Sequence, residues 1–306
     1  MKSGAPLWGI DLGGTKIEGA LVDPADPLSA LHRLRRPTGA EHGYEHILSA
    51  IEAVVDDLAR VSGLPRPVCL GIGTPGTEDP ASGCLKNSNT VCLNGRPLCG
   101  DLSQRLGCEV RIANDANCFA LAEATWGAAA GADVVLGLII GSGTGAGIVA
   151  GGRLIQGLHG IAGEWGHNPI RNESVPCYCG RTGCVETVIA GPSLERFYRE
   201  ATGEALRLPG IVSRAIEGDR IASATLERLR EKFSEAIAAV MNILDPDVIV
   251  VGGGVGNLPL FYEEATRASI ARHLFNPVVR TRIVPPALGD SAGVFGAARL
   301  SAPFTA

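Results

Sequence analysis

The sequence predicts an α/β fold made of two related domains, and two observations support this prediction. An apolar strand, a glycine-rich turn and a second strand occur in that order twice, around residues 11–16 and again around 141–145. After each occurrence, short apolar strands alternate with amphipathic helices, which is typical of α/β domains. One such turn would indicate little by itself. The pair, in matching local context, indicates two related domains with a nucleotide between them.

The composition is typical of a globular enzyme. The chain has 306 residues, a mean hydropathy of +0.18 and a formal net charge of −5, which is enough for two domains with separate cores. The weak acidity provides no attraction to nucleic acid or to an anionic membrane, so we expect neither as a partner. The N-terminal residues lack the apolar stretch of a signal peptide, and six cysteines are scattered from Cys69 to Cys118. Both features favour a cytoplasmic protein.

Residues 134–152 carry no charge, so a membrane-spanning segment has to be considered. Seven of these residues are glycine, and they fall in a patterned turn. A glycine-rich segment of this kind favours two strands around a turn over a membrane helix.

The first glycine-rich turn has the sequence DLGGTK at residues 11–16, between predicted strands at 7–10 and 17–22. A Walker A loop or a Rossmann fingerprint would be followed by a helix, and the helical periodicity is missing here. Two interpretations remain. The backbone N–H groups of the turn bind phosphate oxygens, or the turn is an ordinary hairpin connection.

The first half of the chain continues with a predicted helix at 43–60 and strands at 68–72 and 110–113. The polar segment 79–101 is interpreted as a substrate-facing loop, although a plain surface connection fits nearly as well. After the last strand comes Asn114-Asp115-Ala116-Asn117, and a helix is expected at 118–127. Asp115 either faces a ligand at the end of its strand or caps the helix. Both functions are served if Asn117 is the cap and Asp115 faces the cleft.

The second half begins with predicted strands at 134–140 and 146–150 around the second turn. Helices are then expected from residue 191, at 226–244, at 260–275 and at 289–300, with a buried strand at 248–251. The three glycines at 252–254 allow a flat ring to approach the backbone, or they form the entry to a helix.

The segment 163–186 combines one imidazole with three thiols, from His167, Cys177, Cys179 and Cys184. One nitrogen and three sulfurs at tight spacing, with glycines between them, indicate a closed tetrahedral zinc site. Such a site would order a loop that carries the carboxylates of Glu164 and Glu186, which could hold a ligand rich in hydroxyl groups. The alternative is a buried cysteine cluster beside a surface histidine.

Taken together, these motifs resemble the ROK family of sugar kinases, within the superfamily that also contains actin and the heat-shock ATPases. The resemblance covers essentially the whole chain and rests on the segments DLGGTK (11–16), IGTPG (72–76), NDAN (114–117), GSGTGAG (141–147), GEWGH (163–167), CYCGRTGCVE (177–186) and DPDVIVVGGG (245–254). It implies a two-domain actin-like ATPase fold, related to ribonuclease H, with a nucleotide and sugar cleft between domains 1–114 plus 291–306 and 115–290. Ser142 stands where the family often has threonine, and it retains the hydroxyl.

The resemblance also implies the roles of individual residues. Asp115 would be the catalytic base, and His167 would bind both zinc and sugar. The implied sugar ligands are Gly76, Asn114, Asp115, Glu164, His167 and Glu186. The implied Mg-ATP ligands are Asp11, Gly13, Gly14, Thr15, Lys16, Gly141, Ser142, Gly143, Thr144 and Gly145, with Gly253 and Gly254 at the adenosine.

Within the family, the segments KNSNTVCLNGRPL and EWGHNPI are most similar to the fructokinase branch. We therefore expect an ATP- and Mg²⁺-dependent hexose kinase that makes fructose 6-phosphate, carries a structural zinc ion and forms a homodimer. The alternatives are an N-acetylglucosamine kinase or glucokinase, a sugar-independent ATPase and, more distantly, a sugar-sensing transcriptional regulator. Such a regulator carries a helix-turn-helix domain before the first turn, whereas the first strand is expected here from about residue 7.

Overall fold

The computed structural model describes residues 5–276 and 278–303, and the chain divides into two compact units. The first unit comprises Met1–Gly131, Gly147–Ala162 and Ala287–Ala306, and the second comprises Ala132–Ala146 and Gly163–Pro286. These bounds differ from the predicted domains because residues 115–131 and 147–162 group with the first unit. Residues 1–4 and 304–306 of the predicted first domain lie outside the described residues.

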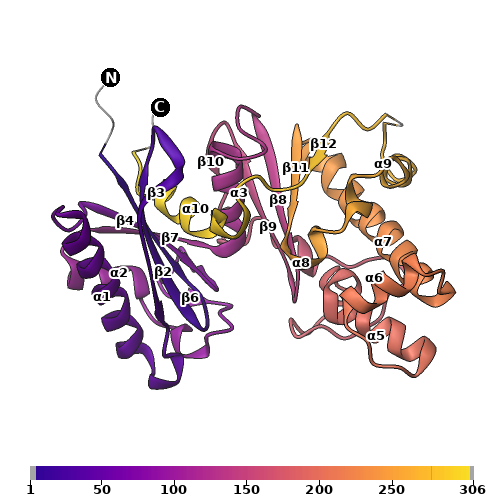
Figure 1. Cartoon of the computed structure of the whole chain (residues 1–306), viewed down its shortest axis with the longest axis horizontal. Coiled ribbons are helices and arrows are strands. Elements are labelled where there is room, and N and C mark those ends of the chain that lie inside the picture. The colour runs from indigo at the N-terminus through magenta and orange to yellow at the C-terminus, as the bar shows by residue number, and fades with distance from the viewer. Residues whose placement is uncertain (1–4, 277, 304–306) are drawn as a thin grey trace. The chain divides into compact units, whose positions relative to one another are not determined.

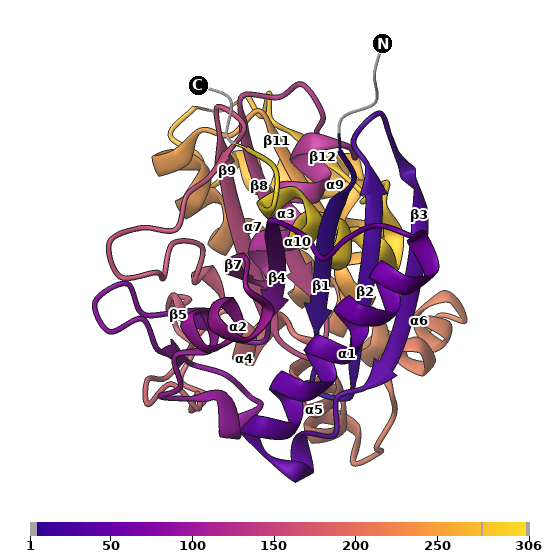
Figure 2. The same cartoon turned by 90° about the vertical axis from the view of Figure 1, so that its left-hand side faces the viewer.

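The first unit contains a five-stranded sheet in the order β3-β2-β1-β4-β7 (Figure 2). Its strands are β1 (Leu7–Leu12), β2 (Lys16–Asp23), β3 (Asp26–Pro37), β4 (Cys69–Thr74) and β7 (Glu109–Asn114). Strands β1, β2 and β3 pair antiparallel, whereas β1, β4 and β7 pair parallel. The carboxyl ends of the three parallel strands therefore meet at one edge, where Asp11 pairs with Gly73 and Thr74 with Asn114.

Helices cover both faces of this sheet (Figures 1 and 2). One face carries α1 (Tyr44–Ser62) and α2 (Leu98–Leu106), and the other carries α3 (Asp115–Thr125) and α10 (Ala292–Leu300). The apolar residues of α1 recur every three or four positions, so one stripe of the helix is buried in the core of the unit.

Helix α10 lies against the sheet backbone because glycine stands at the contact points. A Cβ atom added to Gly71 would lie 1.8 Å from the carbonyl oxygen of Ala297, and one on Gly9 would lie 2.4 Å from the Ala298 nitrogen. A Cβ on Gly296 would lie 1.8 Å from the carbonyl oxygen of Cys118 in α3. Glycine thus permits close packing of β1, β4, α3 and α10, which explains why α3 belongs to the first unit.

Shorter elements complete the first unit. They are η1 (Ala40–His42), β5 (Thr77–Glu78), β6 (Leu85–Lys86), η2 (Val91–Leu93), β10 (Arg153–Leu154) and η5 (Gly289–Ser291). The β5–β6 hairpin holds the segment after β10, because Thr77 Oγ1 donates to the Gly160 carbonyl at 3.0 Å and Lys86 Nζ donates to the His159 carbonyl at 2.9 Å.

The second sheet has the order β10-β9-β8-β11-β12, and the boundary between the units falls within β9. Its further strands are β8 (Val134–Ile140), β9 (Thr144–Ala150), β11 (Val248–Gly252) and β12 (Arg282–Val284). Strands β8, β11 and β12 are parallel, and every residue of β11 is buried. A continuous apolar strand with parallel neighbours is typical of the centre of an α/β sheet.

The longest helix of the second unit, α7 (Arg220–Leu244), packs against α4 (Glu186–Ile189), α5 (Gly191–Thr202), α6 (Leu208–Ile216) and α9 (Glu264–Ala271). The Asp219 side chain caps it by accepting from the backbone of Ile221 and Ala222. The fully buried Phe233 of α7 meets the rings of Trp165 and Phe261 edge to face. The unit also contains η3 (Trp165–His167), α8 (Gly253–Gly256) and η4 (Pro259–Tyr262).

The structure confirms the two strand–turn–strand units and the helices predicted at 43–60 and 226–244. Residues 134–150 form β8, β9 and their turn, and no helix in the described part of the chain is long and apolar enough to span a membrane. The helix predicted at 260–275 is divided into η4 and α9. Strand β3 and helix α2 were not predicted, because polar residues interrupt their apolar patterns.

Candidate functional site

Two carboxylates lie at the carboxyl edge of the first sheet, where the parallel strands end. Asp11 is the fifth residue of β1, and Asp115 begins α3 directly after β7. Glycines approach Asp11 from two sides. A Cβ atom on Gly73 would lie 3.6 Å from Asp11 Oδ1, and one on Gly293 of α10 would lie 3.3 Å from Asp11 Oδ2. The Asp11 carboxylate is therefore held in a narrow space by backbone.

Burial makes both carboxylates harder to ionise. Burial first, and then the charge of Asp115, raises the pKa of Asp11 to about 6. Burial also raises the pKa of Asp115, although its Oδ1 accepts a hydrogen bond of 2.8 Å from the Ala116 N–H. This edge of the first unit thus concentrates negative charge, which favours a bound cation and a group able to accept a proton.

Asn114, rather than Asn117, caps α3. Its Oδ1 accepts a 2.7 Å hydrogen bond from the Asn117 N–H, so the helix begins at Asp115 and the prediction that Asn117 is the cap is wrong. Asn117 is only 3% exposed, and its Oδ1 has no hydrogen-bond partner among the residues that the structure describes. The Asn114 side chain thus uses its oxygen for the cap, and its amide nitrogen is the group that could contact a ligand.

The predicted phosphate turn after β1 is closed by a hydrogen bond of 2.9 Å from the Gly13 N–H to the Lys16 carbonyl. Thr38, which is fully buried, holds the turn from outside. Its Oγ1 donates to the Gly13 carbonyl at 2.7 Å, and its N–H donates to the Thr15 carbonyl at 3.0 Å. Gly14 lies between them in the exposed part of the turn. The sequence analysis missed Thr38, since nothing in its own surroundings indicates the turn more than twenty residues away.

Gly76 lies at a close backbone contact. A Cβ atom there would lie 2.6 Å from the Lys86 carbonyl oxygen, and Thr74 Oγ1 donates to the Gly76 carbonyl at 2.8 Å. The structure thus explains why glycine occupies this position, whereas its predicted contact with a sugar stays a prediction.

In the second unit, the turn between β8 and β9 is bound to Glu186. Glu186 Oε2 accepts a 2.8 Å hydrogen bond from the Thr144 N–H, and a Cβ on Gly143 would lie 2.7 Å from the same oxygen. The Gly141 carbonyl accepts from the Gly191 N–H at 2.8 Å. The buried Thr144 Oγ1 has no partner within the described residues. The Gly141 and Thr144 N–H groups are thus occupied, and the Ser142 and Gly143 N–H groups with the Thr144 hydroxyl remain as groups suited to phosphate oxygens.

A cavity of about 500 Å³ opens beside this turn within the second unit. Ser142 and Gly254 line it together with mostly apolar residues: Gly141, Gly191, Pro192, Glu195, Arg207, Leu208, Pro209, Val212, Val255 and Leu258. Gly253 supports the wall, because its φ is +85° and a Cβ there would lie 2.4 Å from the Ile140 carbonyl. A cavity of this size with flat apolar walls suits a nucleobase and its ribose.

Packing of Trp165 fixes the turn that carries Glu164 and His167. The indole is 3% exposed, and its Nε1 donates to the Ala236 carbonyl of α7 at 3.2 Å. A Cβ atom on Gly166 would lie 2.2 Å from the Thr144 carbonyl, so this turn also lies directly against the β8–β9 turn. Three predicted parts of the site are thus brought together in the second unit: Glu164, the glycine turn between β8 and β9, and Glu186.

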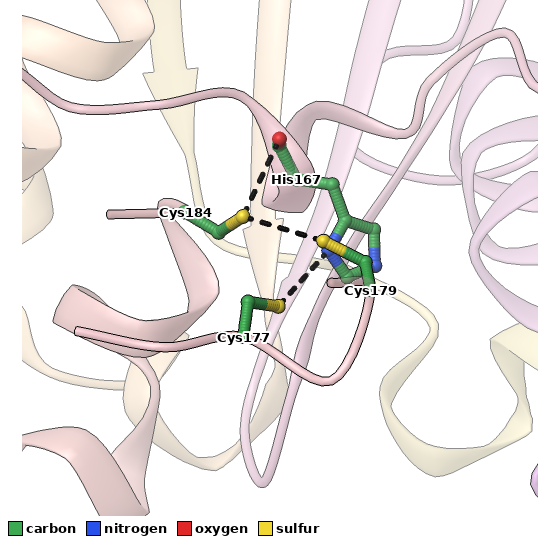
Figure 3. A group of neighbouring side chains, drawn as sticks. All are labelled: His167, Cys177, Cys179 and Cys184. Carbon is green, nitrogen blue, oxygen red and sulfur yellow. Dashed lines mark hydrogen bonds between the residues drawn. The ribbon is translucent and has the colours of Figure 1, made fainter. Parts of the chain in front are cut away.

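The four predicted metal ligands converge (Figure 3). The candidate ligand atoms of His167, Cys177, Cys179 and Cys184 all lie within 4.8 Å of one another. Cys177 Sγ lies 3.6 Å from His167 Nδ1, and Cys179 Sγ lies 3.6 Å from Cys184 Sγ. Tetrahedral zinc requires about 3.8 Å between two sulfurs and about 3.6 Å between sulfur and nitrogen, given bonds of about 2.3 and 2.0–2.1 Å. The four residues fit a zinc ion.

Backbone hydrogen bonds fold the metal loop. Two of these bonds are 2.8 Å long: the Cys177 N–H donates to the Arg181 carbonyl, and the Gly183 N–H donates to the Val175 carbonyl. Glu173 joins the loop to α7 through two bonds from Arg228, of 2.9 and 2.8 Å. Hydrogen bonds from the backbone and side chain of Arg181 lower the pKa of Cys179 to about 6, which favours the thiolate that a metal requires.

Tyr178 is a neighbour of this site that the sequence analysis missed. Its hydroxyl oxygen lies 3.0 Å from His167 Nε2, the nitrogen that was predicted to face a sugar. Partial burial of this largely exposed side chain, and then the charges of Glu186 and Glu164, raise the pKa of Tyr178 to about 12, so the phenol is neutral at physiological pH. The second contact of His167 is therefore made within the chain in this structure.

Asp11→Asn should stabilise the protein at neutral pH. A carboxylate whose pKa is raised in the folded state favours unfolding above that pKa, and the penalty disappears as the pH falls toward the unfolded value. We expect the variant to gain about 1–3 kcal/mol at pH 7.5 and close to nothing at pH 4, measured by urea unfolding. Asp57→Asn is the control, and it should lower the stability at pH 7.5 instead, because hydrogen bonds from Arg36 lower the pKa of Asp57 in the folded protein. Equal stabilities of Asp11→Asn and wild type at pH 7.5 would contradict the prediction.

Comparison with known proteins places this geometry in a family. The model of the ROK family matches residues 7–303. An N-acetyl-D-glucosamine kinase from Pasteurella multocida is 38% identical over an alignment of 307 positions, which covers 96% of this chain and 98% of the relative.

Solved structures agree with this match. A ROK hexokinase from Thermus thermophilus is 32% identical with a TM-score of 0.87, and the alignment covers 97% of each chain. A ROK family glucokinase from Streptomyces griseus in complex with glucose and AMPPNP is 29% identical with a TM-score of 0.77, over 97% of this chain and 99% of that one. The predicted fold class is confirmed, and this chain belongs to the ROK family.

Proposed function

We propose that this protein is an ATP-dependent N-acetyl-D-glucosamine kinase. As a member of the ROK family with kinase relatives throughout its length, the chain is a sugar kinase. The observation that carries the choice of sugar is the 38% identity to an N-acetyl-D-glucosamine kinase over nearly the whole length of both proteins. The fructokinase assignment is wrong as the main interpretation, because this similarity supports the alternative instead. The expected homodimer and cytoplasmic location stay predictions.

ATP is the proposed phosphoryl donor. The cavity beside Ser142 and Gly254 has the size and the apolar walls that a nucleobase requires. The N–H groups of the adjacent turn, together with the unpaired Thr144 hydroxyl, are suited to phosphate oxygens. The Streptomyces griseus relative was solved with AMPPNP, an analogue of ATP, which supports the same donor here.

Asp115 is the proposed general base. It would accept the proton of the attacking hydroxyl, and its position at the helix start beside Asn114 fixes its direction. Burial raises the pKa of Asp115, which makes the carboxylate a stronger proton acceptor. The primary 6-hydroxyl of the sugar is the least hindered nucleophile. Asn114 would contact another hydroxyl through its amide nitrogen.

Asp11 is the proposed partner of Mg²⁺ and the phosphates, along with the turn of residues 13–16. The carboxylate is an oxygen donor of the kind that Mg²⁺ prefers, and its pKa is raised by burial first and by the charge of Asp115 second, so a bound cation would favour its ionised form. A bound Mg²⁺ neutralises charge on the transferring phosphoryl group. The chain itself contributes alignment, which supplies much of the catalysis in phosphoryl transfer.

In the second unit, Glu164, His167 and Glu186 are the proposed sugar ligands. Two carboxylates accept hydrogen bonds from hydroxyl groups, and an imidazole N–H donates one. A structural zinc ion on His167 and the three cysteines would order the loop that leads to Glu186. The proposed role of the metal is therefore to position sugar ligands, while phosphoryl transfer takes place elsewhere.

A panel of sugars tests the proposed substrate. We expect kcat/KM to be highest for N-acetylglucosamine and lower by about 5- to 150-fold or more for glucose, mannose and fructose. A site built around the acetamido group leaves buried partners unpaired when that group is missing, at about 1–3 kcal/mol for each. The kcat/KM for each of the four sugars is measured from ADP release in a coupled assay at one fixed ATP concentration. A higher kcat/KM for glucose than for N-acetylglucosamine would leave the kinase in place and overturn this choice of sugar.

Asp115→Asn tests the base. The variant keeps the size and the Ala116 contact of the side chain but loses the ability to accept a proton, so we expect kcat to fall by about 10²–10⁴-fold or more. Binding of AMPPNP, followed by calorimetry, should stay within about twofold of wild type because the proposed nucleotide site does not include this carboxylate. Turnover near the wild-type rate in the folded variant would exclude Asp115 from the mechanism.

Cys177→Ala tests the metal. Protein purified without added metal should contain one zinc per chain by elemental analysis, and the variant should contain almost none. We expect its KM for N-acetylglucosamine to rise more than its KM for ATP. The matched control is Cys84→Ala, a cysteine of the first unit outside the cluster. Full zinc content in Cys177→Ala, or wild-type protein free of metal, would rule the site out.

A further inference from the structure

The histidine of the metal cluster has its two ring nitrogens in different surroundings. Nδ1 lies 3.6 Å from Cys177 Sγ, among the metal ligands, and Nε2 lies 3.0 Å from the Tyr178 hydroxyl oxygen. The two rings meet edge to face, with centroids 5.2 Å apart and an interplanar angle of 88°. A metal on Nδ1 leaves the proton on Nε2, so the imidazole donates and the phenol oxygen accepts.

The position of Tyr178 follows from the loop itself. Its neighbours in the chain, Cys177 and Cys179, are both candidate ligands, so a metal bound to His167 would also fix the backbone on either side of Tyr178. A partner for the outer nitrogen of a metal-bound histidine orients the ring, and its loss typically lowers metal affinity by about 10–100-fold. Tyr178 therefore occupies the position of such a partner.

The phenol is nevertheless easy to displace. The Tyr178 side chain is 83% exposed, in contrast to 3% for Trp165 in the same unit. No core packing has to be disrupted when an exposed ring moves away, and only one hydrogen bond to His167 has to be replaced. A sugar hydroxyl arriving at His167 could thus replace the phenol as the acceptor.

We propose that the His167 Nε2–H exchanges its acceptor, from the Tyr178 hydroxyl in the free protein to a sugar hydroxyl in the complex. Tyr178 is then a positioning residue, which holds the imidazole and protects the metal site while no sugar is bound. This inference rests on the proposed function, because it takes N-acetylglucosamine to be a ligand of His167. It also explains how one imidazole serves the metal and the substrate, since its outer N–H has an acceptor in both states.

The exchange predicts that altering Tyr178 strengthens the thermodynamic coupling between zinc and sugar. In wild type, one acceptor replaces another, so the exchange itself adds nothing to the coupling that ordering of the metal loop provides. In Tyr178→Phe the free protein lacks its acceptor, and zinc affinity should fall by about 10–100-fold. Saturating N-acetylglucosamine supplies a new acceptor and should restore most of this loss. Linkage requires the effect of zinc on sugar affinity to grow in the variant by the same factor.

The measurement is equilibrium competition for zinc between the holoprotein and a chromophoric chelator, without ATP and with or without N-acetylglucosamine. Tyr44→Phe is the control, because it removes a phenol hydrogen bond, to Asp101, in the first unit. Its zinc affinity should equal that of wild type. Equal zinc affinities of Tyr178→Phe and wild type without sugar would remove Tyr178 from the metal site. A loss that N-acetylglucosamine does not reverse would overturn the exchange.

These outcomes are separate from a failure of the proposed function. The zinc affinity of Tyr178→Phe without sugar tests the positioning role whatever the substrate is. Absence of N-acetylglucosamine turnover in zinc-replete wild type would instead refute the proposed kinase activity. If wild type turns over N-acetylglucosamine normally and Tyr178→Phe has unchanged zinc affinity, the kinase activity stands and the exchange is excluded.

Discussion

The hydrogen bond between the Glu186 carboxylate and the Thr144 N–H joins the two halves of the second unit's candidate site. Glu186 follows the last metal ligand, Cys184, by two residues, and Thr144 belongs to the glycine turn between β8 and β9. The path of the metal loop therefore decides where the turn is held. A Cβ on Gly143 would lie 2.7 Å from the same carboxylate oxygen, so glycine there leaves this hydrogen bond undisturbed. A partly buried carboxylate bonded to backbone orders both partners, so a shift of the loop would move the turn with it.

The first unit depends on a different constraint, the contact between α10 and the sheet backbone. Gly9 and Gly71 let the helix approach so closely that Gly293 reaches the Asp11 carboxylate. Burying this carboxylate, with the charge of Asp115 close by, costs free energy, which appears as the raised pKa of Asp11. Rigid packing around a functional group commonly maintains such an unfavourable arrangement. A bound cation would favour the ionised carboxylate, so a cost to the free protein would become affinity for the Mg²⁺ that we propose to bind here.

Much of the fold could be predicted from the sequence because its main elements have strong local patterns, such as the apolar stripe of α1 and the buried run of β11. The convergence of the four candidate metal ligands was predictable for the same reason, since their spacing is local. Thr38 and Tyr178 were not, because their contacts depend on tertiary structure that no nearby pattern encodes. The choice of sugar failed for a related reason. Residues that bind hydroxyl groups are shared by kinases of several sugars, and discrimination depends on the shape of the pocket around them.

The metal loop also shows why this site would use zinc rather than a hydrophobic core. Residues 168–183 contain no helix and no strand. Most of them are exposed, whereas Ile170, Cys177 and Gly183 are buried and Glu173 and Val175 are partly buried. With so little apolar burial, packing alone would not order this irregular backbone well enough to position sugar ligands. Four ligands around one ion would supply that order locally, and the Glu173–Arg228 pair joins the loop to α7. If a metal orders this loop, the loop also depends on the groups that hydrogen-bond to the metal ligands. Tyr178, an exposed residue that contacts His167, could therefore influence sugar binding through the metal although it does not belong to the core.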